Sequence, residues 1–130
     1  MLNGIGNTIR VSLSDSPIEE VKAGINILQA VGLRKDFVEI ISCPTCARTE
    51  FDVITISKQL RESVKNIRKP MKIAVMGCVV NGIGEGESAD YGVAGGKEQS
   101  LIFSKGKILY KIDNSKVFEC LMYLMEGKNE

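Results

Sequence analysis

The chain has 130 residues, which is enough for one domain of ordinary size with a hydrophobic core. Its composition, 44% hydrophobic and 25% charged, is typical of a globular protein, and its formal net charge of +1 predicts no nucleic-acid or membrane partner. The sequence contains no histidine, which excludes Ser-His-Asp catalysis, Cys-His catalysis and every histidine-based zinc site.

The amino terminus and the cysteines together indicate a compartment. The first ten residues, MLNGIGNTIR, show no pattern of a signal or transit peptide, and no apolar run is long enough to span a bilayer. We therefore expect a cytoplasmic protein. Four cysteines in that compartment indicate metal ligands or reactive thiols rather than a disulfide framework.

The first predicted unit is a strand followed by a helix. Residues 8–13, TIRVSL, alternate between apolar and polar side chains, which predicts a strand with two different faces. Ser16, Pro17 and Glu19 predict the start of a helix with a capping box, and Gly32 predicts its end. Because one strand and one helix cannot bury their own apolar faces, this unit indicates part of a larger fold.

Two buried strands, each followed by a cysteine segment, are predicted next. Residues 37–41 lead into the motif CPTC, and residues 72–76 lead into a Gly-Cys pair. Between them a helix with an apolar stripe over residues 53–67 ends before Pro70. If this helix joins two parallel strands, their carboxyl ends lie at the same edge of the sheet, and the cysteines are brought together there.

The remaining sequence predicts a loop, a hairpin and a last helix. The loop is expected over the glycine-rich residues 81–97, and strands over 100–103 and 107–112 are joined by a tight Lys-Gly turn. Asn114 or Ser115 then caps the last helix. These elements predict an α/β fold with α+β character, in which helices flank a mixed β-sheet.

Cys43, Cys46 and Cys78 form a pattern that indicates a metal site. The Cys-x-x-Cys pair supplies two thiolates from one turn, and the distant third cysteine closes the site from another element. Spacing alone leaves open an iron–sulfur cluster, a structural zinc site and a redox dithiol. A zinc ribbon requires a second Cys-x-x-Cys pair, which is not present, and a redox dithiol needs no third cysteine.

Two residues are candidates for a fourth ligand. Cys120 lies among apolar residues of the predicted last helix, so we favour a small buried hydrophobic side chain there. Glu85 lies in the predicted glycine loop, and its carboxylate is a hard, weakly matched ligand for an iron otherwise bound by sulfur. A solvated loop carboxylate is the alternative for Glu85, and spacing alone does not separate the two.

Polar residues of two other segments suggest contacts with phosphate or sulfide. Arg10 and Ser12 share the polar face of the first predicted strand, and in a β/α barrel such a pair suits a phosphate. A solvated strand face is the more ordinary explanation. The segment GIGEGE lacks the ending of a phosphate-binding loop, and its glycines are better explained by backbone N–H groups that approach bridging sulfides.

Four segments of the chain resemble one enzyme family. GIGNTIRVSLSDSP, CPTCARTEFDV, GCVVNGIGE and ADYGVAGGK are similar to segments of 4-hydroxy-3-methylbut-2-enyl diphosphate synthase, of the non-mevalonate isoprenoid pathway. The similarity covers nearly the whole chain. It implies that residues 1–33 are the last β–α unit of a (β/α)8 barrel that is otherwise absent. It also implies that residues 34–130 form a sulfite-reductase-type domain with a [4Fe–4S] cluster.

The resemblance implies roles for individual residues. Four cluster ligands are implied: Cys43, Cys46, Cys78 and Glu85. Arg10 and Ser12 are implied to hold the substrate's diphosphate, and Asn81 to hydrogen-bond the substrate beside the cluster. The family's usual Asn-Gly-Pro-Gly-Glu reads Asn-Gly-Ile-Gly-Glu here, and isoleucine does not fix φ as proline does, so a looser segment before Glu85 is expected.

The resemblance also implies a reaction and partners. The reaction is a two-electron reductive opening of 2-C-methyl-erythritol 2,4-cyclodiphosphate with loss of water, and Glu85 is the replaceable ligand that gives way to the substrate. Flavodoxin or ferredoxin is the implied electron donor, and the implied homodimer closes the cluster domain of one subunit over the barrel of the other. We therefore expect the chain to bind a cluster but to have no turnover alone. The alternative is a non-catalytic metal module, either zinc-stabilised or an electron carrier.

Overall fold

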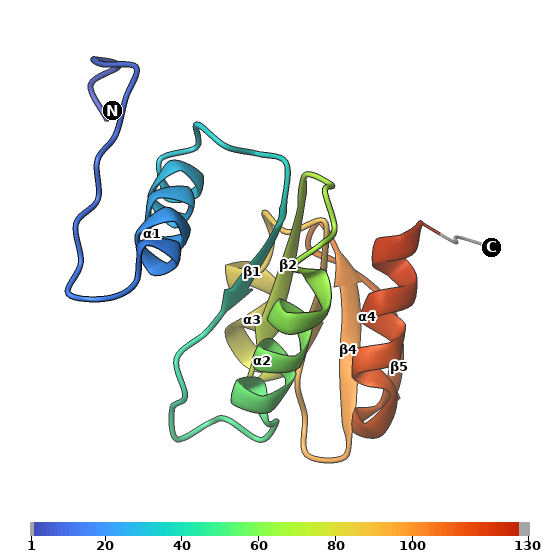
Figure 1. Ribbon diagram of the computed structural model, residues 1–130. Helices are drawn as coiled ribbons and strands as arrows, with labels where there is room; N and C mark the ends of the chain where they lie inside the picture. The colour runs from blue at the N-terminus through green and yellow to red at the C-terminus, as the bar shows by residue number, and fades with distance from the viewer. Residues whose placement is uncertain (1, 128–130) are drawn as a thin grey trace. The chain divides into compact units, whose positions relative to one another are not determined.

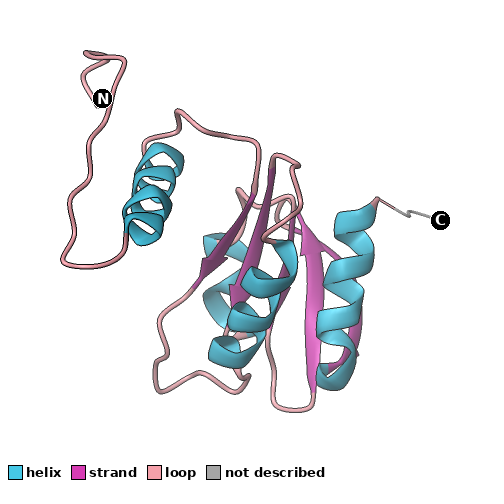
Figure 2. Ribbon diagram, viewed as in Figure 1, coloured by secondary structure: helices cyan, strands magenta, loops and turns pink. Residues whose placement is uncertain are grey.

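The chain consists of two compact units, Met1–Asp36 and Phe37–Glu130. The computed structural model describes residues 2–127, except for the side chains of Asn81 and Glu85. Figures 1 and 2 show the helices, strands and loops of each unit. In the described part of the chain, no helix combines the length and the apolar character needed to cross a bilayer.

The first unit contains one helix, α1 (Pro17–Ala30), which follows a long extended segment. The strand predicted over residues 8–13 is not formed, so that prediction was wrong. The physical reason is the lack of a partner strand, because all five strands of the described residues belong to the second unit, and an unpaired strand leaves its backbone groups unsatisfied. Gly32 has a φ of 73° just beyond α1, as its predicted role at the helix end requires.

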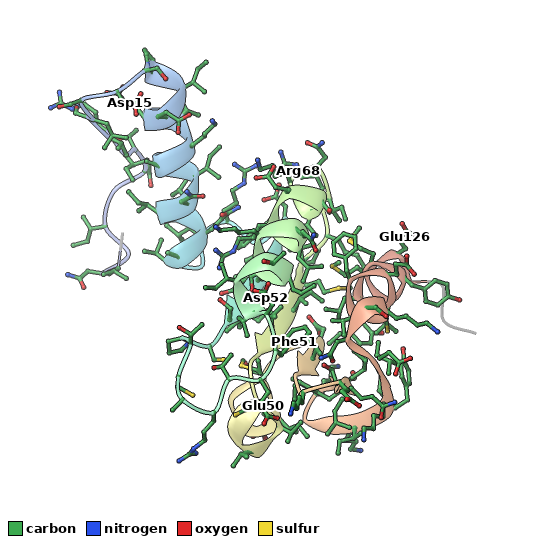
Figure 3. The ribbon with its side chains drawn as sticks, turned by 90° about the horizontal axis from the view of Figure 1, so that it is seen from below. Asp15, Glu50, Phe51, Asp52, Arg68 and Glu126 are labelled. Carbon is green, nitrogen blue, oxygen red and sulfur yellow. The ribbon has the colours of Figure 1, made fainter. Side chains whose placement is uncertain are left out.

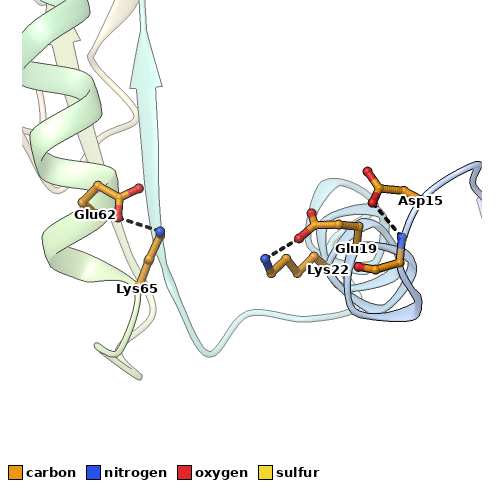
Figure 4. A network of polar contacts seen from close by, with 6 residues as sticks. Asp15, Glu19, Lys22, Glu62 and Lys65 are labelled. Carbon is orange, nitrogen blue, oxygen red and sulfur yellow. Dashed lines mark hydrogen bonds and ion pairs between the residues drawn. The ribbon is translucent and has the colours of Figure 1, made fainter.

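Helix α1 begins where the sequence predicts, but without the capping box. Pro17 occupies the first helical position, where a missing N–H loses no intrahelical hydrogen bond. The Ser16 side chain makes no cap hydrogen bond, and the Ser16 backbone N donates instead to Asp15 Oδ1 at 2.6 Å. Figure 3 labels Asp15, and Figure 4 draws this bond as a dashed line. Glu19 forms an ion pair with Lys22 at 2.6 Å, and this pair occupies the carboxylate that a capping box would use (Figure 4).

The second unit is built on a five-stranded mixed sheet. Its strands lie in the order of the chain: β1 (Val38–Ser42), β2 (Met71–Met76), β3 (Tyr91–Ala94), β4 (Gln99–Ser104) and β5 (Lys107–Asp113). β1, β2 and β3 are parallel, whereas β4 is antiparallel to both β3 and β5. The predicted mixed sheet of an α/β fold is therefore confirmed. The sulfite-reductase-type and barrel assignments remain predictions.

Helices cover both faces of this sheet. Figure 1 shows α2 (Val53–Val64) and α4 (Val117–Glu126) on one face and α3 (Val79–Glu85) on the other. A short 3-10 turn, Asn114–Lys116, precedes α4. Alternate residues of β2 divide between the two cores, because Ile73 and Val75 pack with α2 and α4, whereas Ala74 and Met76 pack on the α3 side.

The glycine-rich segment differs from its prediction. Residues 81–97 were expected to form a loop, but they contain most of α3 and all of β3. The glycines are needed for close packing: a Cβ at Gly82 would lie 2.8 Å from Met76 Cβ, and one at Gly86 would collide with the Phe103 ring. A run of glycines thus marks a short helix pressed against a sheet, which composition alone does not distinguish from a loop.

Candidate functional site

The three predicted ligand cysteines follow two neighbouring strands. Cys43 comes directly after β1, and Cys78 comes two residues after the end of β2. These strands are parallel, with Ser42 opposite Val75, so their carboxyl ends lie at one edge of the sheet. The backbone N of Cys43 donates to Val75 O at 3.3 Å, which extends the strand pairing up to the first cysteine. This placement is the one expected from the sequence.

All three thiols line a single cavity of about 190 Å³ at this edge. Its other lining residues are Pro44, Arg48, Met76, Gly77 and Gly82. Cys46 is exposed, Cys43 and Cys78 are half-buried, and all are free thiols. The cavity therefore combines sulfur donors from two separate loops with backbone from a third segment, helix α3.

The described thiols do not form a compact single-ion site. Among the side chains that the structure describes, no three histidines, cysteines, aspartates or glutamates are grouped closely enough to hold a metal ion. Two predicted site residues, Asn81 and Glu85, have side chains outside the described part of the chain. The site is thus defined by three thiols that line one cavity, and Glu85, the fourth predicted ligand, stays a prediction.

Hydrogen bonds reach the sulfur atoms of two of the cysteines, and at Cys46 they favour the thiolate form. A hydrogen bond from the backbone N–H of Arg48 has the largest effect on the pKa of Cys46 and lowers it, and a hydrogen bond from the Thr49 hydroxyl lowers it further. The backbone N of Gly77 donates to Cys43 Sγ at 3.1 Å. Because the thiolate is the form that binds metal, the donors at Cys46 favour metal binding by that residue.

The segment after the Cys-x-x-Cys motif connects this motif to the neighbouring loops. Glu50 N donates to Gly77 O at 3.1 Å, directly before Cys78. A Cβ at Gly95 would collide with the Phe51 side chain, so the end of β3 approaches the residues before α2 very closely. Figure 3 shows Glu50 and Phe51 next to Asp52, whose side chain accepts from Thr55 N at 3.0 Å and caps α2. The residues after the cysteine motif therefore contact the segment after β2, the end of β3 and the start of α2.

Thr49 is a site residue that the sequence prediction did not include. Cys46 N donates to Thr49 Oγ1 at 2.9 Å, and Thr49 N donates to Cys46 O at 3.0 Å. The signal that was available is a threonine three residues after a cysteine in a short loop, because threonine hydroxyls often bond to nearby backbone groups.

Asn81 and Glu85 lie in a helix rather than in the predicted loop. α3 begins after Cys78 and ends at Glu85, so the expectation of a flexible loop around Glu85 was wrong. Their spacing of four places the two Cα atoms on the same side of this helix. The side chains themselves lie outside the description, so their predicted roles stay predictions.

The remaining predicted residues are not among those that line this cavity. Arg10 and Ser12 are exposed in the extended segment of the first unit, and their predicted binding of a diphosphate is untested. Cys120 is half-buried, packs against the main core and lies 3.1 Å, through its sulfur, from Tyr110 Oη. Its packing against the core agrees with the predicted hydrophobic surroundings, and its exclusion as a ligand stays a prediction.

Comparisons with known proteins give the family. Residues 39–127 match the family described as GcpE protein C-terminal domain. A protein of Caldanaerobacter subterraneus is 57% identical over 109 residues, which are 84% of this chain and 30% of that protein. Proteins of Thermodesulfovibrio yellowstonii and Thermotoga maritima are 49% and 50% identical over 94% and 96% of this chain, and 35% and 36% of their own lengths.

All three relatives are named 4-hydroxy-3-methylbut-2-en-1-yl diphosphate synthase (flavodoxin). This chain spans about a third of their length. The family match covers most of the chain and includes both cysteine segments, all of the sheet except its first residue, and all three helices of the second unit. The chain belongs to the GcpE family, and its second unit corresponds to the C-terminal domain of that family.

Proposed function

We propose that this chain contributes the cluster-binding domain of a 4-hydroxy-3-methylbut-2-enyl diphosphate synthase. The observation that carries the proposal is that Cys43, Cys46 and Cys78, from two neighbouring strand ends, line one cavity. The names of the relatives support the enzyme, and the word flavodoxin in those names supports the electron donor. Ferredoxin is the other donor that we propose.

The residues of the cavity fit a [4Fe–4S] cluster in donor type and in arrangement. Thiolates are the usual ligands of iron–sulfur clusters, and a four-iron cluster binds each thiolate at a different iron. It can therefore join thiols that share a cavity without being grouped around one ion. The N–H of Gly77 that donates to Cys43 Sγ is also of the kind that stabilises negative charge on cluster sulfur. We propose four ligands: Cys43, Cys46, Cys78 and Glu85.

The proposed substrate is 2-C-methyl-erythritol 2,4-cyclodiphosphate, which is opened by two electrons with loss of water. The bound cluster would supply these electrons one at a time. Glu85 is the proposed catalytic residue, because a carboxylate is a weaker match for iron than a thiolate and can be displaced by substrate. Asn81, on the same side of α3, would hydrogen-bond the substrate, while Arg10 and Ser12 would hold its diphosphate.

Further parts of the enzyme are proposed to complete this site. The relatives are about three times as long as this chain. We propose a cytoplasmic homodimer in which the cluster domain of one subunit closes over a barrel domain of the other. The 130-residue chain alone is then expected to have no turnover, and synthase activity of the purified chain would contradict this arrangement.

Anaerobic reconstitution of the chain with iron and sulfide tests the proposal. We expect iron and acid-labile sulfide in equal amounts, about four of each per chain, with visible absorption. Bound zinc without sulfide would instead support a zinc-stabilised module. Glu85→Ala separates an enzyme from an electron carrier, since it should change the electron paramagnetic resonance spectrum of the reduced cluster only where Glu85 is a ligand. An unchanged spectrum would remove Glu85 from the site.

A further inference from the structure

Thr49 contacts both loops that carry the ligand cysteines. Its backbone and hydroxyl exchange two hydrogen bonds with the backbone of Cys46, at 3.0 Å and 2.9 Å. On its other side, a Cβ built on Gly77 would lie 2.9 Å from Thr49 Cγ2 and 3.1 Å from Thr49 Oγ1. Gly77 directly precedes Cys78, and its backbone N donates to Cys43 Sγ at 3.1 Å. Thr49 thus bonds to Cys46 and packs against Gly77, the residue that precedes Cys78 and donates to Cys43.

The hydroxyl of Thr49 has a hydrogen atom available for a thiolate. It accepts from Cys46 N, and a hydroxyl that accepts one hydrogen bond can still donate its own proton. Thr49 Oγ1 lies 3.8 Å from Cys46 Sγ, a distance that the large radius of sulfur permits for a hydrogen bond. The acceptor bond holds the oxygen in place and leaves its own proton free to donate to the sulfur.

We propose that Thr49 is a positioning residue that raises the reduction potential of the metal group held by the three cysteines. This inference rests on the proposed function, because it concerns the cluster that Cys46 would bind. Reduction adds negative charge that spreads onto the sulfur ligands, and a hydrogen bond to a ligand sulfur stabilises that charge. Removal of the hydroxyl should therefore make the cluster harder to reduce.

Replacement of Thr49 by valine and by serine separates the hydroxyl from the packing. Thr49→Val keeps the shape that contacts Gly77 and loses the donor, whereas Thr49→Ser keeps the donor and loses the methyl group. In a redox titration of the reconstituted chain, Thr49→Val should change the ratio of oxidised to reduced cluster about tenfold at a fixed potential. For a one-electron couple this is a lowering of about 59 mV. Thr49→Ser should titrate as the unaltered chain does.

Thr55→Val serves as the matched control. Thr55 is an exposed residue in the first turn of α2 that bonds to Asp52 and to no cysteine in the described part of the chain. Its replacement should leave the midpoint of the titration unchanged. An unchanged midpoint in Thr49→Val, or an equal shift in Thr49→Ser, would overturn the inference, because the hydroxyl would then have no separate effect.

A second pair of variants covers the case in which Thr49→Val does not take up the cluster. Thr49→Ala and Thr49→Ser differ only in the hydroxyl, so the same tenfold difference is expected between them. If Thr49→Ser alone loads, the hydroxyl is needed to hold the group rather than to tune its potential, and the inference is overturned. If the unaltered chain takes up no iron and sulfide, the proposed function fails and the inference fails with it. A loaded chain with unshifted variants refutes the inference alone.

Discussion

Gly95 allows the end of β3 to lie against the residues that precede α2. A Cβ there would collide with the Phe51 side chain, which is itself buried, and Gly95 N donates to Met76 O at 2.8 Å. Gly95 is therefore in close contact with Phe51 and bonds to Met76, a residue that lines the cysteine cavity. Its effect on stability comes from this space requirement, since its backbone does not lie in the left-handed region.

Gly95→Ala should destabilise the second unit. The added methyl group forces Phe51 or the backbone of β3 to move, and overpacking of this kind costs about 1–3 kcal/mol. Urea unfolding followed by circular dichroism measures the change. Gly84→Ala is the matched control, because a Cβ at Gly84 meets nothing within 4 Å. In the helix α3 this alanine should be neutral or stabilising by up to about 1 kcal/mol. Equal loss of stability in both variants would contradict the packing argument.

Strand β5 and helix α4 meet through a pair of titratable side chains. Tyr110 of β5 lies with its hydroxyl 3.1 Å from the Cys120 sulfur of α4. Partial burial, followed by the hydrogen bond to Cys120, raises the pKa of Tyr110 from 10.0 to about 12. The phenol is thus held in its neutral form between these two elements, and the unfolded chain loses this proton at a lower pH.

The raised pKa of Tyr110 predicts a loss of stability in alkali. Below pH 10 both states keep the proton, so the shift has no effect there. Between about pH 10 and pH 12 the unfolded state binds fewer protons, so the free energy of unfolding falls as the pH rises. Tyr110→Phe removes this contribution. Urea midpoints at a series of pH values should fall less steeply for Tyr110→Phe, and parallel curves for the two proteins would refute the assignment.

Elements with a strong pattern of their own were predictable from the sequence. The apolar strands β1 and β2, helix α2 and the β4–β5 hairpin were all expected, and the turn residues Lys105 and Gly106 have φ of 48° and 76°. Such positive values suit a two-residue hairpin. Strand β3 and helix α3 were missed because packing against neighbours, rather than local periodicity, specifies them.

The part of the candidate site that follows from strand patterns was predictable from the sequence. Strand order brought Cys43 and Cys78 to one edge, as the βαβ pattern required. Thr49 was not predictable, because its contact with Gly77 depends on the folded positions of two loops. The prediction of a strand over residues 8–13 was wrong although the local pattern is strong. The alternating pattern is present, but the described residues contain no strand that pairs with it.

At the scale of the whole molecule, the hydrophobic core belongs to the second unit. Every residue of the two core clusters lies between Val38 and Met125, whereas the first unit exposes apolar side chains such as Ile18 and Val21. The cysteine cavity is likewise formed by the second unit alone. We therefore expect the metal group to depend on the sheet edge of that unit and on its thiols.

The most direct test is the iron and acid-labile sulfide content of two cysteine variants after anaerobic reconstitution. Cys78→Ala removes a thiol that lines the cavity, and Cys120→Ala removes the one thiol in the described chain that does not line it. The account predicts that Cys120→Ala retains the content of the unaltered chain and that Cys78→Ala loses most of it, with both variants folded by circular dichroism. A folded Cys78→Ala protein that keeps its full iron and sulfide would contradict the account.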